Sequence, residues 1–329
     1  FTLIFLWEEL WHLENTAYLS SCLLLLITAG AVIFSVLFER RFWCRYLCPI
    51  GGMNGLFAKL SMTELRAQQG TCSAECTTYQ CYKGGPQKGE GQATNGCPLY
   101  SHPAQLVDNR DCVLCMTCLK ACPHRSVELN LRPPGIELWT THQPRPHEVA
   151  LLLLLLGGIF LHHLPELETW LGIDLHLTQF WPHAGVSVAV LAIAALMPLA
   201  GQGLLHLVNQ GKHRPFLELA YGYLPLVLGG TLAHYLRLGL TEAGQVLPVA
   251  FATFGVAGTH LPSISAHPAV IAFLQGSTLI VSLVLTGLLT QKIGRQSWQN
   301  LWPQHLTALI LTLCLWHLVL GNGSLSQVL

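Results

Sequence analysis

Four cysteines crowd residues 111–125, DCVLCMTCLKACPHR, in the order C-x2-C-x2-C-x3-C, with Pro123 directly after the fourth. This spacing is typical of chains that ligate a [4Fe–4S] cluster. A tight loop can bring three of the thiolates round one cubane, and the fourth usually belongs to a second cluster. A zinc knuckle would need two C-x2-C pairs set apart by a longer loop, so the pattern favours iron–sulfur ligation. The expected ligands are Cys112, Cys115, Cys118 and Cys122.

A second, stretched set of cysteines precedes this motif. Cys72, Cys76 and Cys81 have the spacing C-x3-C-x4-C, and Cys97 follows after the glycine-rich segment 82–96. In a two-cluster ferredoxin each motif gives three ligands to its own cluster and one to the other. A structural zinc ion at the looser site is the alternative. The rule predicts a first cluster held by Cys97, Cys112, Cys115 and Cys118, and a second held by Cys72, Cys76, Cys81 and Cys122.

A third pair, Cys44 and Cys48, lies in RFWCRYLCPIGG, residues 41–52. Two residues four apart share one helical face, so the pair can give two ligands to a further cluster or metal, or form a dithiol/disulfide couple. Inert, buried thiols are the remaining reading. The neighbouring Arg40, Arg41 and Arg45 favour thiolate, which suits ligation or redox chemistry better than packing.

The composition of the chain predicts a membrane protein. Only 10% of its residues are charged, against about 25% in typical soluble proteins, and its formal net charge is zero. That balance offers no basic face for a nucleic acid. Cys22 and Cys314, alone in apolar runs, are expected to be small buried hydrophobes. Runs long enough for a bilayer helix occupy 18–38, 184–208, 217–240, 268–291 and 306–321, and a shorter run, 149–163, spans if it extends into the following LPEL.

The basic residues predict the orientation, since Lys and Arg collect on the cytoplasmic side. All of them except Arg237 fall on one side of the expected spans, together with the cysteine-rich segment. We therefore expect an all-α polytopic protein of the bacterial inner membrane with a cytoplasmic, dicluster ferredoxin-like insert. Its expected parts are membrane helices over 1–59, in a chain truncated at its start, the insert over 60–147, and a membrane domain of about five helices over 148–329. The insert is too short to bury much core, so clusters would supply folding energy.

Sixteen histidines are a high number for such a chain. His234 and His317 lie in the outer parts of their spans, where ionisable residues are functional candidates. On facing helices they could ligate a haem b or line a quinol or proton site. The alternative is that each histidine caps or hydrogen-bonds a neighbouring helix. Clusters on one side need some relay across about 30 Å of hydrocarbon, and a haem, a quinone or a cluster beside Cys44 would provide it.

RFWCRYLCPIGG, followed by a ferredoxin unit and more membrane helices, resembles the NapH/NosR-type membrane polyferredoxins over roughly residues 18–135. The resemblance implies electron transfer at the cytoplasmic membrane, between the quinone pool or a cytoplasmic donor and periplasmic redox systems. Members of that family carry a second C-x3-C-P motif beside a membrane helix. Here the only other C-x3-C-P is part of the ferredoxin motif, so a partner motif for Cys44 and Cys48 is expected before Phe1.

The leading hypothesis is a membrane-bound protein that passes single electrons through two [4Fe–4S] clusters to or from a membrane or periplasmic redox partner. The insert has no nucleotide-binding glycine motif, nucleophile triad or paired catalytic carboxylates, so no catalytic residue is expected. The alternative is a redox-sensing or maturation factor for a partner metalloenzyme. A third hypothesis is a metal transporter in which outer histidines such as His260 and His267 bind a cation.

Overall fold

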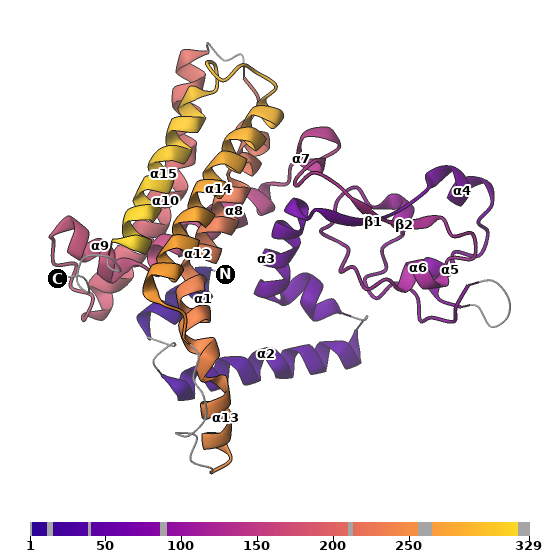
Figure 1. Cartoon of the computed structure of the whole chain (residues 1–329), viewed down its shortest axis with the longest axis horizontal. Coiled ribbons are helices and arrows are strands. Elements are labelled where there is room, and N and C mark those ends of the chain that lie inside the picture. Colours follow the sequence, from indigo (N-terminus) through magenta and orange to yellow (C-terminus); the bar gives the residue numbers. More distant parts are fainter. Residues whose placement is uncertain are drawn as a thin grey trace. The chain divides into compact units, whose positions relative to one another are not determined.

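The computed structural model describes residues 2–11, 16–38, 41–85, 91–209, 213–255 and 265–321. Contacts divide the chain into two compact units (Figure 1). The cysteine unit comprises Leu13–Pro144, and the helical unit comprises Phe1–His12 with Arg145–Leu329. The contacts thus join the apolar helix before Cys44 to the expected insert rather than to the later helices. His260 and Arg40 lie outside the described residues, as does the side chain of Arg45.

Apart from α2, short elements make up the cysteine unit. Among its described residues the sheet is the antiparallel pair β1 (Thr63–Ala67) and β2 (Val127–Leu131), in register from Thr63 opposite Leu131 to Ala67 opposite Val127. The strands therefore bracket the eight cysteines of the two ferredoxin-like motifs. The helices of the unit are α2 (Ala17–Leu37), α3 (Pro49–Phe57), α4 (Gln69–Ala74), α5 (Gln80–Lys83), α6 (Thr117–Ala121) and α7 (Glu137–Thr140). Its other helical turns are the π-helical η1 (Trp43–Leu47) and the 3-10 turns η2 (Ala58–Leu60) and η3 (Pro103–Gln105).

The core of the cysteine unit is small, as its length predicts. Leu65 and Val127 from the two strands pack against the buried side chains of Cys81 and Cys118. Two of the expected ligands thus belong to this buried cluster. An unligated core of this size buries little apolar surface, so bound metal would add substantially to its stability.

Ion pairs hold η2 and the strands to the rest of the cysteine unit. The fully buried Lys59 Nζ lies 2.5 Å from Asp108 Oδ2. Burial alone would raise the pKa of Asp108, but the Lys59 ammonium outweighs it and holds that pKa below its ordinary value. The carboxylate is therefore ionised at neutral pH. Arg66 and Arg132 both bind Glu137, which joins β1 and β2 to α7.

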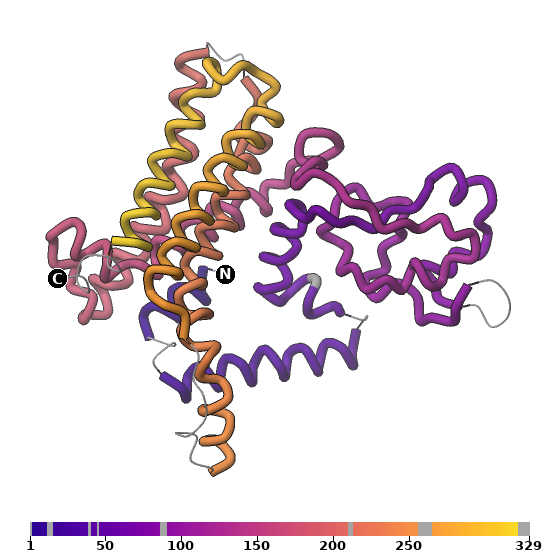
Figure 2. Tube along the Cα trace, viewed as in Figure 1, coloured from indigo at the N-terminus to yellow at the C-terminus, as the bar shows by residue number. Residues whose placement is uncertain are grey.

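A bundle of longer helices forms the helical unit, and Figure 2 traces its course from Arg145 onward. Helix α12 packs against α14, α8 against α10, and α14 against α15. The helices are α1 (Thr2–Leu10), α8 (Pro146–Leu161), α9 (Leu164–Leu171), α10 (Phe180–Val208), α11 (Phe216–Leu219), α12 (Leu224–Glu242), α13 (Val246–Thr253), α14 (Pro268–Gly294) and α15 (Trp302–Leu320), with the 3-10 turns η4 (Ala220–Tyr223) and η5 (Ala243–Gln245).

Small residues let these helices approach closely. A Cβ added at Gly229 of α12 would lie 1.7 Å from the hydroxyl oxygen of Ser282, and one added at Gly201 of α10 would lie 2.4 Å from that of Thr307. Small residues at such contacts are typical of helices that pack within a bilayer.

Five helical segments of the described chain are long and apolar enough to cross a membrane, and a bent pair would make a sixth. This confirms the expected all-α polytopic fold. The run 149–163 does not continue straight into LPEL, however. Helix α8 ends at Leu161, and α9 leaves it at 64°. Pro165 explains the break, because proline lacks the N–H that a continuing helix needs and is well placed in the first turn of a new one.

Candidate iron–sulfur sites

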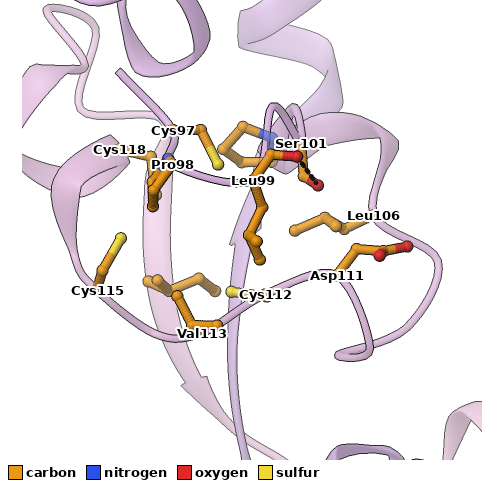
Figure 3. A pocket seen from close by; sticks show the side chains of 12 residues that line it. Cys97, Pro98, Leu99, Ser101, Leu106, Asp111, Cys112, Val113, Cys115 and Cys118 are labelled. Carbon is orange, nitrogen blue, oxygen red and sulfur yellow. Dashed lines mark hydrogen bonds between the residues drawn. The ribbon is translucent and has the colours of Figure 1, made fainter. Parts of the chain in front are cut away.

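Four cysteines surround one cavity in the cysteine unit (Figure 3). Cys112, Cys115 and Cys118 come from the loop before α6 and from its first turn, and Cys97 comes from the segment after the glycine-rich stretch. We call this group the first set. Leu65, Leu99 and Val113 also line the cavity, so its walls are largely apolar. The structure thus brings together the four ligands expected for the first cluster.

The loop reaches this shape through two left-handed residues. Leu114 (φ 49°) and Met116 (φ 60°) lie on either side of Cys115. Positive φ is uncommon for residues with a side chain, and such strained positions cluster at functional sites. Alternation of left-handed and ordinary conformations turns backbone N–H groups to one side of a loop, a shape that suits an anionic group.

The remaining four cysteines form the second set. The Cys81 thiol is close enough to those of Cys122, Cys76 and Cys72, and to that of Cys118 in the first set, to feel the charge of each. Burial, and next these neighbours, raise the pKa of Cys81 to about 12. Burial, and next the thiols of the first set, raise the pKa of Cys118 to about 11. The Cys81 and Cys118 thiols are therefore protonated at neutral pH, and a metal that binds them must displace protons.

The two sets lie side by side. Helix α6 carries Cys118 of the first set and leads directly to Cys122 of the second, one turn later. The backbone N–H of Cys97 donates to the carbonyl of Tyr82, 3.2 Å away, next to Cys81. Each motif therefore sends one cysteine into the other's set, which is the exchange expected of a two-cluster ferredoxin.

The spacing of the thiols bears on the zinc alternative. Among the described residues no three His, Cys, Asp or Glu side chains converge closely enough to hold a single metal ion. A structural zinc ion needs four ligands at about 2.0–2.3 Å from one centre. A cubane carries its thiolates on four separate irons, so they stand farther apart. Sets of four cysteines are the donors that a [4Fe–4S] cubane takes, so the donor chemistry of both sets fits a cluster.

Cys44 and Cys48 flank a π-helical turn rather than sharing one regular helix. Cys44 lies inside η1, and Cys48 is the residue between η1 and α3. A Cβ at Gly51 would lie 1.9 Å from the Cys44 carbonyl oxygen, so the turn requires glycine there. Trp43 packs against Gly30 of α2, which fixes the turn at the end of that apolar helix. Cys44 is exposed and Cys48 half-buried.

Of the two isolated cysteines, which were both expected to be buried, one is exposed. Cys22 is exposed, because α2 packs its sides against few other parts of the described chain, whereas Cys314 is half-buried in α15. In an apolar helix of this length an exposed side chain is one that faces lipid.

The histidines of the helical unit pair differently from the expected arrangement. His234 Nδ1 lies 3.1 Å from His163 Nε2, and the His234 ring stacks on that of His162 at a centroid distance of 5.2 Å. The His317 ring instead lies against Trp170, at 5.1 Å. The break between α8 and α9 places His162 and His163 opposite α12. This bend was not predicted from the sequence. Pro165 was the available signal.

His267 has a helix-capping role. Its Nδ1 accepts a hydrogen bond of 3.2 Å from the Ala269 N–H at the start of α14. This matches the reading in which interfacial histidines cap neighbouring helices. The cation-binding hypothesis also invoked His260, which lies outside the part of the chain that the structure describes.

These features define a class: multi-pass membrane chains that carry ferredoxin-like cysteine motifs. Residues 22–66, which include Cys44 and Cys48, match a family described as a 4Fe-4S binding domain. The described helices supply at least five apolar segments of spanning length.

Curated relatives agree with this class. The chain is 31% identical over 113 residues to YccM, a proposed electron transport protein of Escherichia coli (33% of this chain, 28% of YccM). It is 28% identical over 102 residues to the ferredoxin-type protein NapH of Haemophilus influenzae (30% and 33%) and 32% identical over 90 residues to the protein NirI of Paracoccus denitrificans (27% and 11%). The chain thus spans a third or less of these relatives. No solved structure matches it. The resemblance to membrane polyferredoxins is confirmed.

Proposed function

We propose that this chain is a membrane-bound electron-transfer protein. It passes single electrons between a cytoplasmic or quinone donor and a membrane or periplasmic redox partner. The observation that carries the proposal is the gathering of eight cysteines into two adjacent sets of four in a chain with several apolar helices of spanning length. The names of YccM and NapH point the same way.

Each set of four cysteines would hold one [4Fe–4S] cluster. The first set is Cys97, Cys112, Cys115 and Cys118, and the second is Cys72, Cys76, Cys81 and Cys122. A cluster bound there supplies reversible one-electron chemistry. The protein keeps one side of the first set apolar with Leu65 and Leu99 and leaves Cys115 exposed. The exposed edge at Cys115 is where a redox partner can approach.

The C-x3-C-P pair would link this unit to the membrane. Cys44 and Cys48 supply two thiols at the end of the apolar helix α2, within the segment that matches the 4Fe-4S binding family. Two thiolates are half of what a cubane needs, so the other ligands of a third cluster would come from elsewhere. Residues 49–60 then cover about 18 Å at the rise of a helix. Near the end of this stretch Lys59 meets Asp108, which shortly precedes Cys112 of the first set.

We place the cysteine unit on the cytoplasmic side of a bacterial inner membrane. The support is the distribution of Lys and Arg, which accompany the cysteines on one side of the spans. Protease added to inverted membrane vesicles should cleave within residues 60–147, and the same protease added to right-side-out vesicles should leave them intact. Cleavage only in right-side-out vesicles would reverse the orientation.

Electron release to a soluble acceptor tests the proposed function. Protein purified without oxygen, reduced with dithionite and freed of it, is mixed with ferricyanide in a stopped-flow instrument. About two electrons per chain should be released quickly, one for each cluster. A Cys112→Ser variant that has lost the first cluster should release about one. Clusters that are present but neither take up nor release electrons would exclude a conduit.

The sensing or maturation alternative predicts a different cellular result. In a conduit, Cys112→Ser abolishes turnover of the redox partner and leaves the amount of that partner unchanged. In a sensor or maturation factor, the same variant changes the partner's amount or its metal content instead.

A further inference from the structure

One histidine of the cysteine unit contacts a sulfur of the second set. His102 follows Cys97 by five residues, in a segment that otherwise lines the first cavity. Its Nε2 lies 3.6 Å from Cys81 Sγ, within hydrogen-bonding range for sulfur. The segment thus supplies a ligand to the first set and a polar contact to the second.

The other ring nitrogen decides which way this hydrogen bond runs. Nδ1 of His102 accepts a hydrogen bond of 3.2 Å from the Ala104 backbone N–H, where the histidine caps η3. A neutral imidazole carries one proton, so it lies on Nε2, and Nε2–H donates to the Cys81 sulfur. The rings of Tyr79 and Tyr82 pack on His102 at 6.0 and 6.4 Å and hold it in this position.

A second side chain, that of Ser126, contacts the same set. The Ser126 hydroxyl oxygen lies 3.1 Å from Cys72 Sγ, and the Ser126 N–H donates to Cys122 Sγ over 3.4 Å. The hydroxyl also has the Gln68 carbonyl at 3.3 Å. Once Cys72 binds iron it has no proton to give, and its charged sulfur is the better acceptor. Ser126 is buried, so water does not compete for this contact.

The sulfurs of the first set have different hydrogen-bonding neighbours. Backbone N–H groups of Leu114 and Leu119 face the sulfurs of Cys112 and Cys118. Its side-chain contact is Thr117, whose hydroxyl lies 3.3 Å from Sγ of the exposed Cys115. The second set therefore differs by having side-chain contacts to the buried sulfur of Cys81 and the half-buried sulfur of Cys72, and these contacts can be removed by substitution.

Hydrogen bonds to cluster sulfurs are one of the levers that set a cluster's reduction potential. A reduced cluster carries one more negative charge than an oxidised one, so an N–H aimed at a ligand sulfur stabilises the reduced form more. The potential rises as a result. The effect is largest where solvent does not screen the donor, and Cys81 is the most buried thiol of its set.

We propose that His102 is a positioning residue that raises the reduction potential of the second cluster through Cys81. The proposal rests on the proposed function, because it requires a [4Fe–4S] cluster on Cys72, Cys76, Cys81 and Cys122. Ser126 acts on the same cluster through Cys72, from a different part of the chain.

The test separates the sulfur contact from helix capping. Asparagine is a good cap, so His102→Asn keeps an acceptor for the Ala104 N–H, but its shorter side chain does not reach Cys81. Redox titrations followed by low-temperature EPR measure the potential of each cluster in the wild type, His102→Asn, Ser126→Ala and Thr117→Val. Iron and acid-labile sulfide are measured on the same samples.

With both clusters at full occupancy, His102→Asn should lower the second cluster's potential and leave the first unchanged. At a fixed solution potential, the ratio of reduced to oxidised second cluster should fall about fivefold, which is the size expected from the loss of one hydrogen bond. Ser126→Ala should shift the same cluster in the same direction, and Thr117→Val should spare it.

Two results would overturn the proposal. One is an unchanged reduction potential of the second cluster in a His102→Asn variant that carries both clusters, which would mean that His102 only caps η3. The other is loss of the second cluster from that variant, which would mean that the contact only keeps the ligand loop in place. Wild-type protein that takes up no cluster at all would instead overturn the proposed function.

Discussion

The cysteine unit and the helical unit achieve order by opposite means. In the cysteine unit, one cluster of four buried side chains includes two cysteines that also belong to the expected ligand sets. The helical unit packs long helices through glycines such as Gly229 and Gly201. From this comparison we expect the fold of the cysteine unit to depend on bound metal and that of the helical unit to depend on helix packing.

Metal removal should have the largest effect and should separate the two units. Anaerobic iron chelation should unfold the ligand-bearing part of the cysteine unit, because clusters supply folding energy that its small core lacks. Trypsin should then cut after residues such as Lys83 and Arg125, while Arg145–Leu320 stays protected. Mass spectrometry of the fragments measures this. Continued protection of residues 60–144 after iron loss would show that the unit folds without metal.

Single ligand changes should cost one cluster each. Cys118→Ser and Cys122→Ser lie four residues apart at α6, yet they belong to different sets. Each should lower the iron content from about eight to about four per chain and abolish the magnetic interaction between clusters. The matched control is Cys314→Ser, on a helical-unit cysteine outside both sets. Retention of all iron in either ligand variant would contradict the assignment of that cysteine.

Loss of the buried ion pair should destabilise the cysteine unit alone. Lys59→Met leaves the Asp108 carboxylate buried without its partner, which costs about 3–5 kcal/mol. Chemical denaturation followed by the loss of cluster absorbance measures it. Lys120→Met, at an exposed position of α6, is the control and should change stability by less than about 0.5 kcal/mol. Equal effects of the two variants would show that the pair adds little.

A change at a helix contact should act on the helical unit and spare the clusters. Gly229→Ala forces a methyl group against Ser282 and should cost about 1–3 kcal/mol. Gly239→Ala, on the same helix with nothing within 4 Å, should be neutral or slightly stabilising. Thermal unfolding followed by circular dichroism compares them. A drop in cluster content in Gly229→Ala would mean that the units are not independent.

Sequence reasoning reached the ligand sets because motif spacing in this kind of domain determines which cysteines meet. The exchange of Cys97 and Cys122 between motifs follows from a general rule of two-cluster ferredoxins, and the structure gathers the same two sets. That these sets bind clusters stays a prediction. His102 was missed because its contact with Cys81 depends on the path of an irregular segment, which leaves no periodic signal.

Which helices contact one another could not be predicted from the sequence, for a different reason. Apolar runs gave the spans, but a uniformly apolar helix does not reveal which face meets which neighbour. His234 was therefore matched to His317, whereas the structure pairs it with His163. The π-helical turn at Cys44 was also unexpected, although Gly51 was visible and its closeness to the Cys44 carbonyl requires glycine.

Low-temperature EPR of dithionite-reduced membranes, with iron, acid-labile sulfide and haem quantified on the same sample, tests the central claim most directly. The account predicts two interacting [4Fe–4S]⁺ signals and about eight irons per chain on the two cysteine sets, with further iron only if Cys44 and Cys48 also carry a cluster. Haem b in the same sample would identify a membrane relay. Stoichiometric zinc without any cluster signal or acid-labile sulfide, even after anaerobic reconstitution, would contradict the account.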